Sequence, residues 1–487
     1  MSILALTMLL TAVERELKRR YFIIGMIMNR KKESKKDLVA GLLCFLMTVM
    51  TVVIAADTPQ GEVLEGNINE QPKAAGEMTD VILGDERFDL YLSILENERV
   101  AVFTNQTGIV GDEILTGDDE AIPHRFGQDS DGNEIQYGIH IVDALIQYGV
   151  DVTAIISPEH GFRGTEDAGA SIENSVDERT GLPILSLYTS DKTNSLTTED
   201  MDLFDTLIVD MQDVGLRYYT YYISLYYLMD ACAREGKQVV ILDRPNPNGF
   251  YVDGPILKEE YKSNVGVLPL PVIYGMTWGE LAQMINGEGW LTAGKDACEL
   301  KVVPCDNYTH QTKYELIKRP SPNLKDMRAV YLYTSLCYFE NTVVSVGRGT
   351  EYPFEVYGCP YFEGIEGNDY SFTPESMEGA TEPPYKGEIC YGHDLRNVDM
   401  DDIFDQGIDM DYMIDAYKDY VFLSYPDGRQ DFFGTPDENG HYWIDLLFGT
   451  NEVRNMINQG KSADEIKASW QDDIDLFKEQ REPYLLY

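Results

Sequence analysis

Side chains that can transfer protons, accept hydrogen bonds or bind anions gather at four places in the first half of this sequence. Each place directly follows a short apolar run rich in Val and Ile, at 100–104, 152–156, 206–209 and 239–242. The polar residues after these runs are Asn105, Gln106, Glu159, His160, Arg163, Asp210, Gln212, Asp213, Arg217, Arg244 and Asn246. Asp and Asn at one strand end commonly cap a helix or form a turn. Four loops with this density of charge indicate a binding or catalytic site.

Glu159 is the strongest acid–base candidate, because it follows an apolar run and Pro158, which stiffens the turn. A carboxyl group held against apolar surroundings has a raised pKa, which suits a general acid. Asp210 and Asp213 offer a second carboxyl from a neighbouring loop. Two such carboxyls are the minimum machinery for hydrolysing a glycosidic bond, about 5–5.5 Å apart for a direct nucleophile and about 6.5–9.5 Å apart for inversion. The sequence leaves open whether the second carboxyl attacks, activates water or orients the substrate.

Other site chemistries are disfavoured by missing patterns. No GxGxxG follows any of the four runs and no GxxxxGK[ST] occurs, which argues against a dinucleotide or ATP site. One His among scattered Asp residues is a weak basis for zinc, and no CxxC pair is present. A GxSxG elbow for a nucleophilic serine is missing, and Cys232 lies among apolar residues of a predicted helix. We therefore expect no cofactor and no metal ion.

The elements that would position these side chains follow from periodicity. Residues 141–148 and 218–235 are predicted helices, and Gly236 is typical of a helix end. Strands that alternate with helices predict an α/β, Rossmann-like domain with a largely parallel sheet. Ligands of such sheets bind beyond the carboxyl ends of the strands, so the four loops should share one rim. The tyrosines at 218–227 are mostly expected to be core, with Tyr221 a candidate for a sugar platform.

A second region is predicted after RPSPN at 319–323, where Pro and Asn mark a boundary. The elements expected there are a strand at 329–333, a loop at 363–395, a helix at 410–422, and helices over 452–484 that join near 460–462 with Ser462 as a cap. The stretch 345–354 is expected to reach back over the site through Arg348 and Glu351.

Composition limits the class of protein. The chain has 487 residues, of which 44% are hydrophobic and 25% charged, as in soluble folded proteins. A formal net charge of −44 argues against nucleic-acid binding, which depends on Lys and Arg. The Cys residues after position 56 are too few for a disulfide scaffold in so long a chain. Cys298 and Cys305 flank a predicted strand, which should hold them too far apart to bridge.

The N-terminal segment has the features of an export signal. Basic residues between positions 30 and 36 precede an apolar run at 39–56 that ends in Ile54-Ala55-Ala56. The length of this run also permits an uncleaved membrane anchor. We assign 1–56 to an upstream extension plus a signal peptide or membrane anchor, and 57–84 to a polar linker. The folded part is expected outside the cytoplasm: secreted, periplasmic or anchored at the cell surface.

Several motifs, in order along 85–487, resemble the exo-β-N-acetylmuramidase (NamZ-type) family. The matching blocks include TNQTG (104–108), SPEHGFRG (157–164), VDMQDVGLRYYTY (209–221), LDRPNPNG (242–249), YGMTWGELAQMINGEGWL (274–291), RPSPN (319–323) and SVGRGTEYPFEVYG (345–358). The resemblance implies a Rossmann-like catalytic domain at 85–322 and a smaller α+β domain at 323–487 that closes the cleft. It implies release of N-acetylmuramic acid from the non-reducing end of peptidoglycan fragments, with Glu159 of the PEHG block as catalytic residue.

This implied substrate carries a lactyl carboxylate, which a bidentate Arg fits well. Arg163, Arg217, Arg244 and Arg348 are therefore substrate-binding candidates, although each could instead pair with a neighbouring Asp. The other candidates for contact with muramyl saccharides are Asn105, Gln106, His160, Gln212, Tyr221 and Asn246. The alternative function is a peptidoglycan-fragment-binding protein without catalytic activity.

Overall fold

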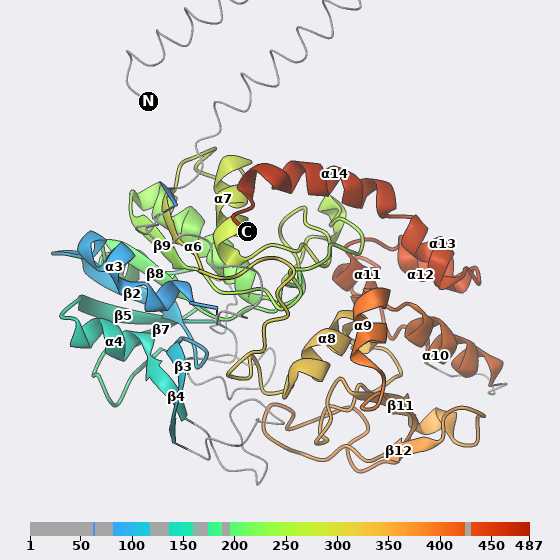
Figure 1. Cartoon of the computed structure of the whole chain (residues 1–487). Helices are drawn as coiled ribbons and strands as arrows, with labels where there is room; N and C mark the ends of the chain where they lie inside the picture. Colours follow the sequence, from blue (N-terminus) through green and yellow to red (C-terminus); the bar gives the residue numbers. More distant parts are fainter. Residues whose placement is uncertain are drawn as a thin grey trace, which may run out of the picture. The chain divides into compact units, whose positions relative to one another are not determined.

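An eight-stranded sheet forms the centre of the N-terminal region, in the order β1-β10-β9-β8-β2-β5-β7-β6 (Figure 1). Neighbouring strands are parallel except for the edge pair β7 and β6. The strands are Glu62–Val63 (β1), Arg99–Thr104 (β2), Asp151–Ser157 (β5), Ser175–Val176 (β6), Pro183–Ser186 (β7), Thr206–Asp210 (β8), Gln238–Leu242 (β9) and Glu299–Val303 (β10). The four predicted runs are β2, β5, β8 and β9, so the prediction of an α/β, Rossmann-like sheet is confirmed.

The computed structural model describes residues 62–63, 81–116, 136–158, 162, 174–187, 195–423 and 430–487. The chain from Gln60 to Tyr487 packs as one unit. The predicted extension and signal or anchor segment, 1–56, and most of the linker lie outside the described residues. Within the described ranges, no helix has the length and apolar character needed to cross a membrane.

Alternate residues of the central strands are buried on opposite faces of the sheet, as the two-residue period of a strand requires. In β2, Ala101 and Phe103 join the larger core, where helices α6 (Tyr221–Glu235) and α7 (Trp278–Gly287) pack. Val100 and Val102 join a second core with α3 (Phe88–Tyr91) and α4 (Ile141–Gln147) on the other face. Because both faces of the sheet are covered, these strands are continuous apolar runs. Polar side chains that could contact a ligand therefore follow the ends of the strands.

The predicted helix at 218–235 begins three residues later, since α6 starts at Tyr221. It ends as predicted at Gly236, whose φ of 64° is the left-handed conformation that glycine adopts without steric cost. The late start leaves Tyr218, Tyr219 and Thr220 in the connection between the sheet and the helix, where their side chains border the site described below.

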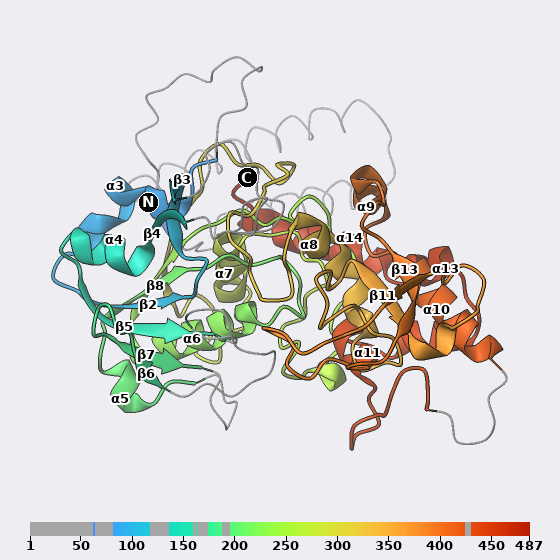
Figure 2. The same cartoon turned by 90° about the horizontal axis from the view of Figure 1, so that it is seen from below.

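The C-terminal region combines a small antiparallel sheet, in the order β11-β13-β12, with short helices (Figure 2). The strands are Val356–Cys359 (β11), Tyr370–Phe372 (β12) and Cys390–Asp394 (β13). The helices are Met327–Leu336 (α8), Met400–Gln406 (α9), Asp411–Phe422 (α10), Trp443–Phe448 (α11), Glu452–Asn458 (α12), Ala463–Ala468 (α13) and Gln471–Arg481 (α14). Ser462 caps α13 as predicted, accepting a hydrogen bond from the Glu465 backbone.

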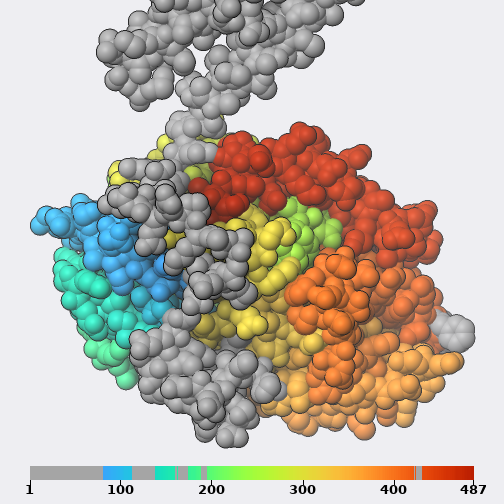
Figure 3. Space-filling view, viewed as in Figure 1, coloured from blue at the N-terminus to red at the C-terminus, as the bar shows by residue number. Residues whose placement is uncertain are grey.

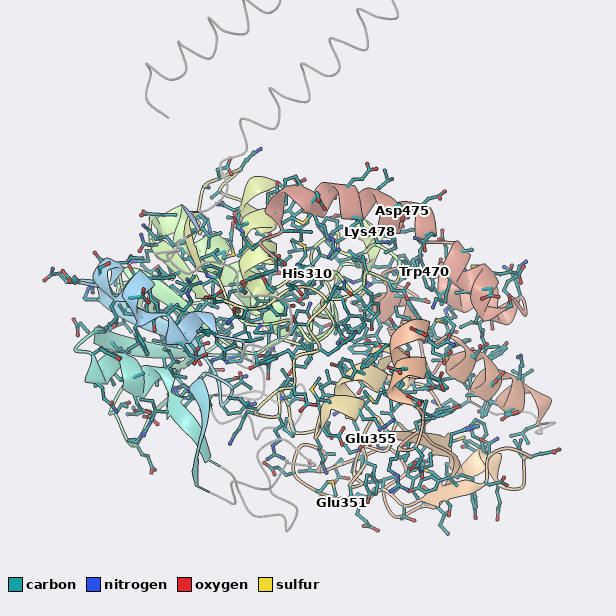
Figure 4. All side chains as sticks on the ribbon, viewed as in Figure 1. His310, Glu351, Glu355, Trp470, Asp475 and Lys478 are labelled. Carbon is teal, nitrogen blue, oxygen red and sulfur yellow. The ribbon has the colours of Figure 1, made fainter. Side chains whose placement is uncertain are left out.

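The end of the chain returns to the N-terminal region, where α14 runs back toward α7 (Figures 1 and 3). Tyr487 donates its hydroxyl hydrogen to Asp243 Oδ2 at 2.8 Å, just beyond β9. The Leu486 backbone N–H donates to Glu280 Oε1 at 2.7 Å, and His310 lies 2.9 Å from the same oxygen (Figure 4). This tail ties the two regions together at the carboxyl side of the sheet. The proposed division between 85–322 and 323–487 stays a prediction.

Two predicted elements of the C-terminal region are wrong. Residues 329–333, predicted as a strand, lie inside α8, which Asp326 caps by accepting from the Ala329 backbone at 2.9 Å. Residues 329 to 336 of α8 are all buried, so the segment shows no polar face and its apolar run resembled a strand. The predicted loop at 363–395 contains β12 and β13. Cys298 and Cys305 are free and buried, as expected.

Candidate active site

The strand order reverses between β2 and β8: the chain first builds β5 and β7 on one side of β2 and then crosses to place β8 on the other. Doubly wound sheets bind ligands at such a reversal. The loops after the two strands are locked together, because the Gln212 backbone N–H donates to Thr107 Oγ1 at 2.9 Å. Asn105 fixes Thr107 in turn, since its Oδ1 accepts from the Thr107 backbone at 2.9 Å and from Oγ1 at 2.6 Å. The predicted rim therefore exists at β2 and β8.

A cavity of about 730 Å³ lies between the connection into α6 and the C-terminal region. Its wall combines aromatic rings, such as Tyr219, Tyr221 and Phe354, with amide and charged side chains. The amide and charged side chains of the wall are Asn264, Asn323, Glu340, Asn341, Arg348, Glu382 and Gln430. Aromatic faces with a few placed polar groups are typical of sites for small polar ligands.

The backbone at Pro320 joins this cavity to the strand ends. Gln106, after β2, donates from Nε2 to the Pro320 carbonyl at 3.3 Å and to the Arg319 carbonyl at 3.1 Å. Tyr219 and Tyr221, beyond β8, donate their hydroxyl hydrogens to the same Pro320 oxygen at 2.8 and 3.2 Å. Residues 321, 323 and 324 then continue as cavity wall. The loops of two central strands thus border the cavity through one shared carbonyl.

Glu159, His160 and Arg163 lie outside the described residues, so their predicted roles are untested. The strand before them is described: β5 ends at Ser157 and pairs in parallel with β2, with Ile156 opposite Phe103. In the sequence, residue 159 follows the last residue of β5 by two positions. The strands β2, β5 and β8 are parallel, so their carboxyl ends share one edge of the sheet.

Asp213 is a buried carboxyl whose pKa is raised. Its Oδ2 accepts from the Tyr274 hydroxyl at 2.6 Å and from the Gly215 backbone at 2.8 Å. Within the described residues Oδ1 accepts no hydrogen bond. Burial raises the pKa of Asp213 to about 6, although hydrogen bonds from Tyr274 and Gly215 act in the opposite direction. It borders a cavity of about 10 Å³, room for one water molecule at most, and not the large cavity.

Asp210 is held in a buried ion pair. Arg244 donates from Nε to Asp210 Oδ1 at 2.6 Å and from Nη2 to Asp85 Oδ2 at 2.6 Å. Burial raises the pKa of Asp210, while Arg244 lowers it. The guanidinium of Arg244 is thereby shared by two carboxylates, which gives this trio a structural role at the base of the rim.

Arg217 is also committed to the interior, in contrast to its predicted contact with substrate. Its guanidinium is fully buried and donates to the backbone carbonyls of Pro255, Leu270 and Leu447. Burial lowers its pKa to about 10. Neither Arg217 nor Arg244 lines the large cavity. The Nη atoms of Arg217 donate to backbone carbonyls, and Arg244 donates to two carboxylates.

The remaining predicted residues fall into two groups: some bond to groups within the protein, and others line the cavity. Gln212 donates to the carbonyls of Asp213 and Pro245, both at 2.8 Å, and Asn246 donates to the Met276 carbonyl at 2.9 Å. These amides, with Asn105 and Gln106, shape the rim. Tyr221 and Arg348 are the predicted residues that line the cavity. Glu351, expected to reach over the site, is exposed and is not part of its wall (Figure 4).

Sequence reasoning missed several wall residues, above all Glu340, Asn341 and Asn323. Glu340 and Asn341 follow α8 by a few residues, and the sequence pattern assigned no element and no role to them. Asn323 belongs to the RPSPN motif, which marks a predicted boundary and is one of the blocks of the family resemblance, but gave no binding role to Asn323. Among the described residues, no group of three or more His, Cys, Asp or Glu side chains is arranged to hold a metal ion.

The sequence is similar to proteins of a known family. Family models described as "Exo-beta-N-acetylmuramidase NamZ, N-terminal" and "Exo-beta-N-acetylmuramidase NamZ, C-terminal" match residues 130–328 and 331–487. The chain is 33% identical over 361 residues to the peptidoglycan beta-N-acetylmuramidase NamZ of Bacillus subtilis strain 168, covering 69% of this chain and 80% of that protein.

Two crystal structures of DUF1343 family proteins from Bacteroides fragilis NCTC 9343 are similar to this structure. One has a TM-score of 0.70 and 48% sequence identity and covers 84% of this chain and 99% of that one. The other has a TM-score of 0.65 and 26% identity and covers 85% and 100%.

Proposed function

Because this chain belongs to the exo-β-N-acetylmuramidase NamZ family, we propose that it is a glycoside hydrolase that releases N-acetylmuramic acid from the non-reducing end of peptidoglycan fragments. The observation that carries this function is the match of both halves of the chain to the family, together with the identity to a curated peptidoglycan β-N-acetylmuramidase. The cavity supports it, because its volume of about 730 Å³ falls in the range of small-molecule sites. Gln106, just beyond β2, is also hydrogen-bonded to Pro320, next to the wall residue Ser321.

In the proposed reaction Glu159 is the general acid. Its proton passes to the leaving glycosidic oxygen as that bond breaks, and water finally supplies the hydroxyl at the sugar carbon. The place of residue 159 in the sequence, two positions after the end of β5, supports this role, because β5 is parallel to β2 and pairs with it. Asp213 is a better second carboxyl than Asp210, since Asp210 is neutralised by Arg244 and Asp213 has an oxygen without a hydrogen-bond donor.

The test is turnover of a chromogenic N-acetyl-β-muramide by wild-type protein and by Glu159→Gln. Loss of a general acid lowers the rate by roughly 10²–10⁴-fold. Glu199→Gln is the matched control, because Glu199 is an exposed carboxyl on α5 (Thr198–Met201), in the same region and away from the cavity. Unchanged turnover in Glu159→Gln would overturn the assignment. Binding of muramyl sugars without turnover at any pH would instead identify a non-catalytic binding protein.

We further propose that the protein acts outside the cytoplasm, as expected for cell-wall turnover. The basic residues before the apolar run at 39–56 support export, and the small residues at its end support cleavage. Fusion of residues 1–84 to a reporter that is active only after export tests this proposal. Activity of the fusion, lost when the apolar run is interrupted by two Asp residues, is the expected result, and a reporter that stays inactive contradicts it.

A further inference from the structure

The cavity is poor in positive charge. Among the described residues of its wall, Arg348 is the one cationic side chain, in a protein whose formal net charge is −44. An anionic ligand is repelled by such a protein except where a local cation attracts it. A carboxylate that binds in the cavity is therefore expected to bind next to Arg348.

Two glycines hold Arg348 in place. Gly347 and Gly349 have φ values of 76° and 78°, a conformation that other residues adopt only with strain. A Cβ atom at 347 would lie 2.6 Å from Val356 Cγ2 and 2.9 Å from the Tyr352 carbonyl. At 349 it would lie 2.5 Å from Pro383 Cγ. The GRG sequence thus forms a tight turn packed on two sides, which presents Arg348 to the cavity.

One side of the guanidinium is already anchored. Nε donates to Glu340 Oε1 at 2.8 Å and Nη2 donates to the same oxygen. The Phe354 ring lies 5.1 Å from the guanidinium carbon. Within the described part of the chain Nη1 makes no hydrogen bond, and the side chain remains 19% exposed. Arg348 therefore has a fixed orientation and donors left for a ligand.

Arg244, by comparison, pairs with two carboxylates of this chain. Asp210 accepts from Nε at 2.6 Å and from Nη2 at 3.1 Å, and Asp85 accepts from Nη2 at 2.6 Å. Among the described residues, Arg348 pairs with one carboxylate, Glu340, through Nε and Nη2. A ligand carboxylate at Nη1 would give Arg348 a second carboxylate partner, as Arg244 has.

We propose that Arg348, held by Glu340, binds the lactyl carboxylate of the muramyl sugar and so makes the site select N-acetylmuramic acid over uncharged N-acetylhexosamines. This inference rests on the proposed function for the identity of the sugar. Glu340 positions the arginine and also competes with the ligand for it.

Binding can be measured by calorimetry with N-acetylmuramic acid and its methyl ester, which lacks the negative charge and carries one additional methyl group. Wild-type protein should prefer the acid. Arg348→Met should remove this preference, lowering affinity for the acid by roughly 10- to 100-fold and that for the ester little, because hydrogen bonds to charged groups are the stronger ones. Equal losses for acid and ester, or no loss for either, would overturn the inference.

Arg396→Met is the matched control. Arg396 also pairs with a carboxylate, Asp394, and lies 4.1 Å from an aromatic ring, that of Tyr352, but it does not line the cavity. Its replacement should leave the preference for the acid unchanged. Circular dichroism and cooperative melting establish that each variant is folded.

Glu340→Gln serves as a second test, usable even where Arg348→Met does not fold. Removing the competing negative charge should keep or increase the preference for the acid over the ester. A decreased preference for the acid would show that Glu340 itself contributes to recognition of the ligand and would overturn the inference.

The same series separates this inference from the proposed function. Wild-type protein that cleaves the chromogenic muramide but binds acid and ester alike contradicts the inference alone. Protein that prefers the acid without cleaving the muramide contradicts the function alone. Protein that neither binds nor cleaves contradicts both.

Discussion

At the carboxyl ends of the strands, Arg244 pairs with Asp85 and Asp210 and has 4% of its side chain exposed. In the cavity wall, Arg348 pairs among the described residues with Glu340 alone and is 19% exposed. Both arginines pair with carboxylates, Arg244 fully buried and Arg348 partly buried. The first has two anionic partners and therefore builds the rim. The second has one anionic partner and unused donors, so it is available to a ligand. The number of partners, and not burial alone, separates a structural arginine from a binding one.

The largest expected effect comes from breaking the trio at the rim. Arg244→Met leaves Asp85 and Asp210 buried without a cation, and removing one partner of a buried ion pair typically costs about 3–5 kcal/mol. We expect a loss of this size in the free energy of unfolding, measured by urea denaturation. Arg396→Met, at a partly exposed pair, should cost about 0–1 kcal/mol. Similar losses of stability in the two variants would contradict the structural role of the buried ion pairs of Arg244.

A pH-dependent effect is expected at Asp213. Burial raises its pKa to about 6 in the folded protein, above the value near 3.8 of a free Asp, so folding binds a proton between these values. The contribution of Asp213 to stability therefore falls as pH rises from about 4 to about 6 and stays low above that. Asp213→Asn should gain stability relative to wild type over this interval, by about 3 kcal/mol. Urea denaturation at pH 4 and pH 7 measures the difference, and a gap that does not widen with pH contradicts the raised pKa.

A smaller effect is expected at the turn that presents Arg348. Gly347→Ala adds both backbone strain and a clash with Val356, whereas Gly460→Ala, with φ of 73° and open space around it, adds strain alone. The strain costs about 1 kcal/mol, and the clash should add about 1–2 kcal/mol. Thermal melting compares the two variants. Only Gly347→Ala should also weaken binding of N-acetylmuramic acid; an equal loss of binding in Gly460→Ala would show a general effect on folding.

The smallest effect is expected where the chain end meets the rim. Tyr487→Phe removes the hydroxyl that donates to Asp243 and accepts from the Cys305 backbone, while Thr277 and Gly279 still donate to Asp243. Loss of these bonds should cost about 1–2 kcal/mol in the free energy of unfolding. Calorimetric melting tests this value. No change in melting temperature would show that the tail does not support the rim.

The sheet was predictable because β2, β5, β8 and β9 are buried on both faces and are therefore apolar throughout. The buried helix α8 was mistaken for a strand for the same reason, since burial on all sides removes the polar face that marks a helix. From the sequence, Arg217, Arg244 and Arg348 are all predicted to bind the substrate. Their difference depends on partners that are distant in the chain, such as Asp85, 159 residues before Arg244, and Leu447, 230 residues after Arg217.

The central claim is that a muramyl sugar binds in the cavity between the connection into α6 and the C-terminal region. A crystal structure of Glu159→Gln soaked with a muramyl-terminated disaccharide tests this directly. We predict the terminal ring in the cavity between Tyr221 and Arg348, its carboxylate within hydrogen-bonding distance of Arg348, and the side chain at 159 facing the glycosidic oxygen. A sugar bound elsewhere on the protein, or a side chain at 159 turned away from that oxygen, would contradict the account.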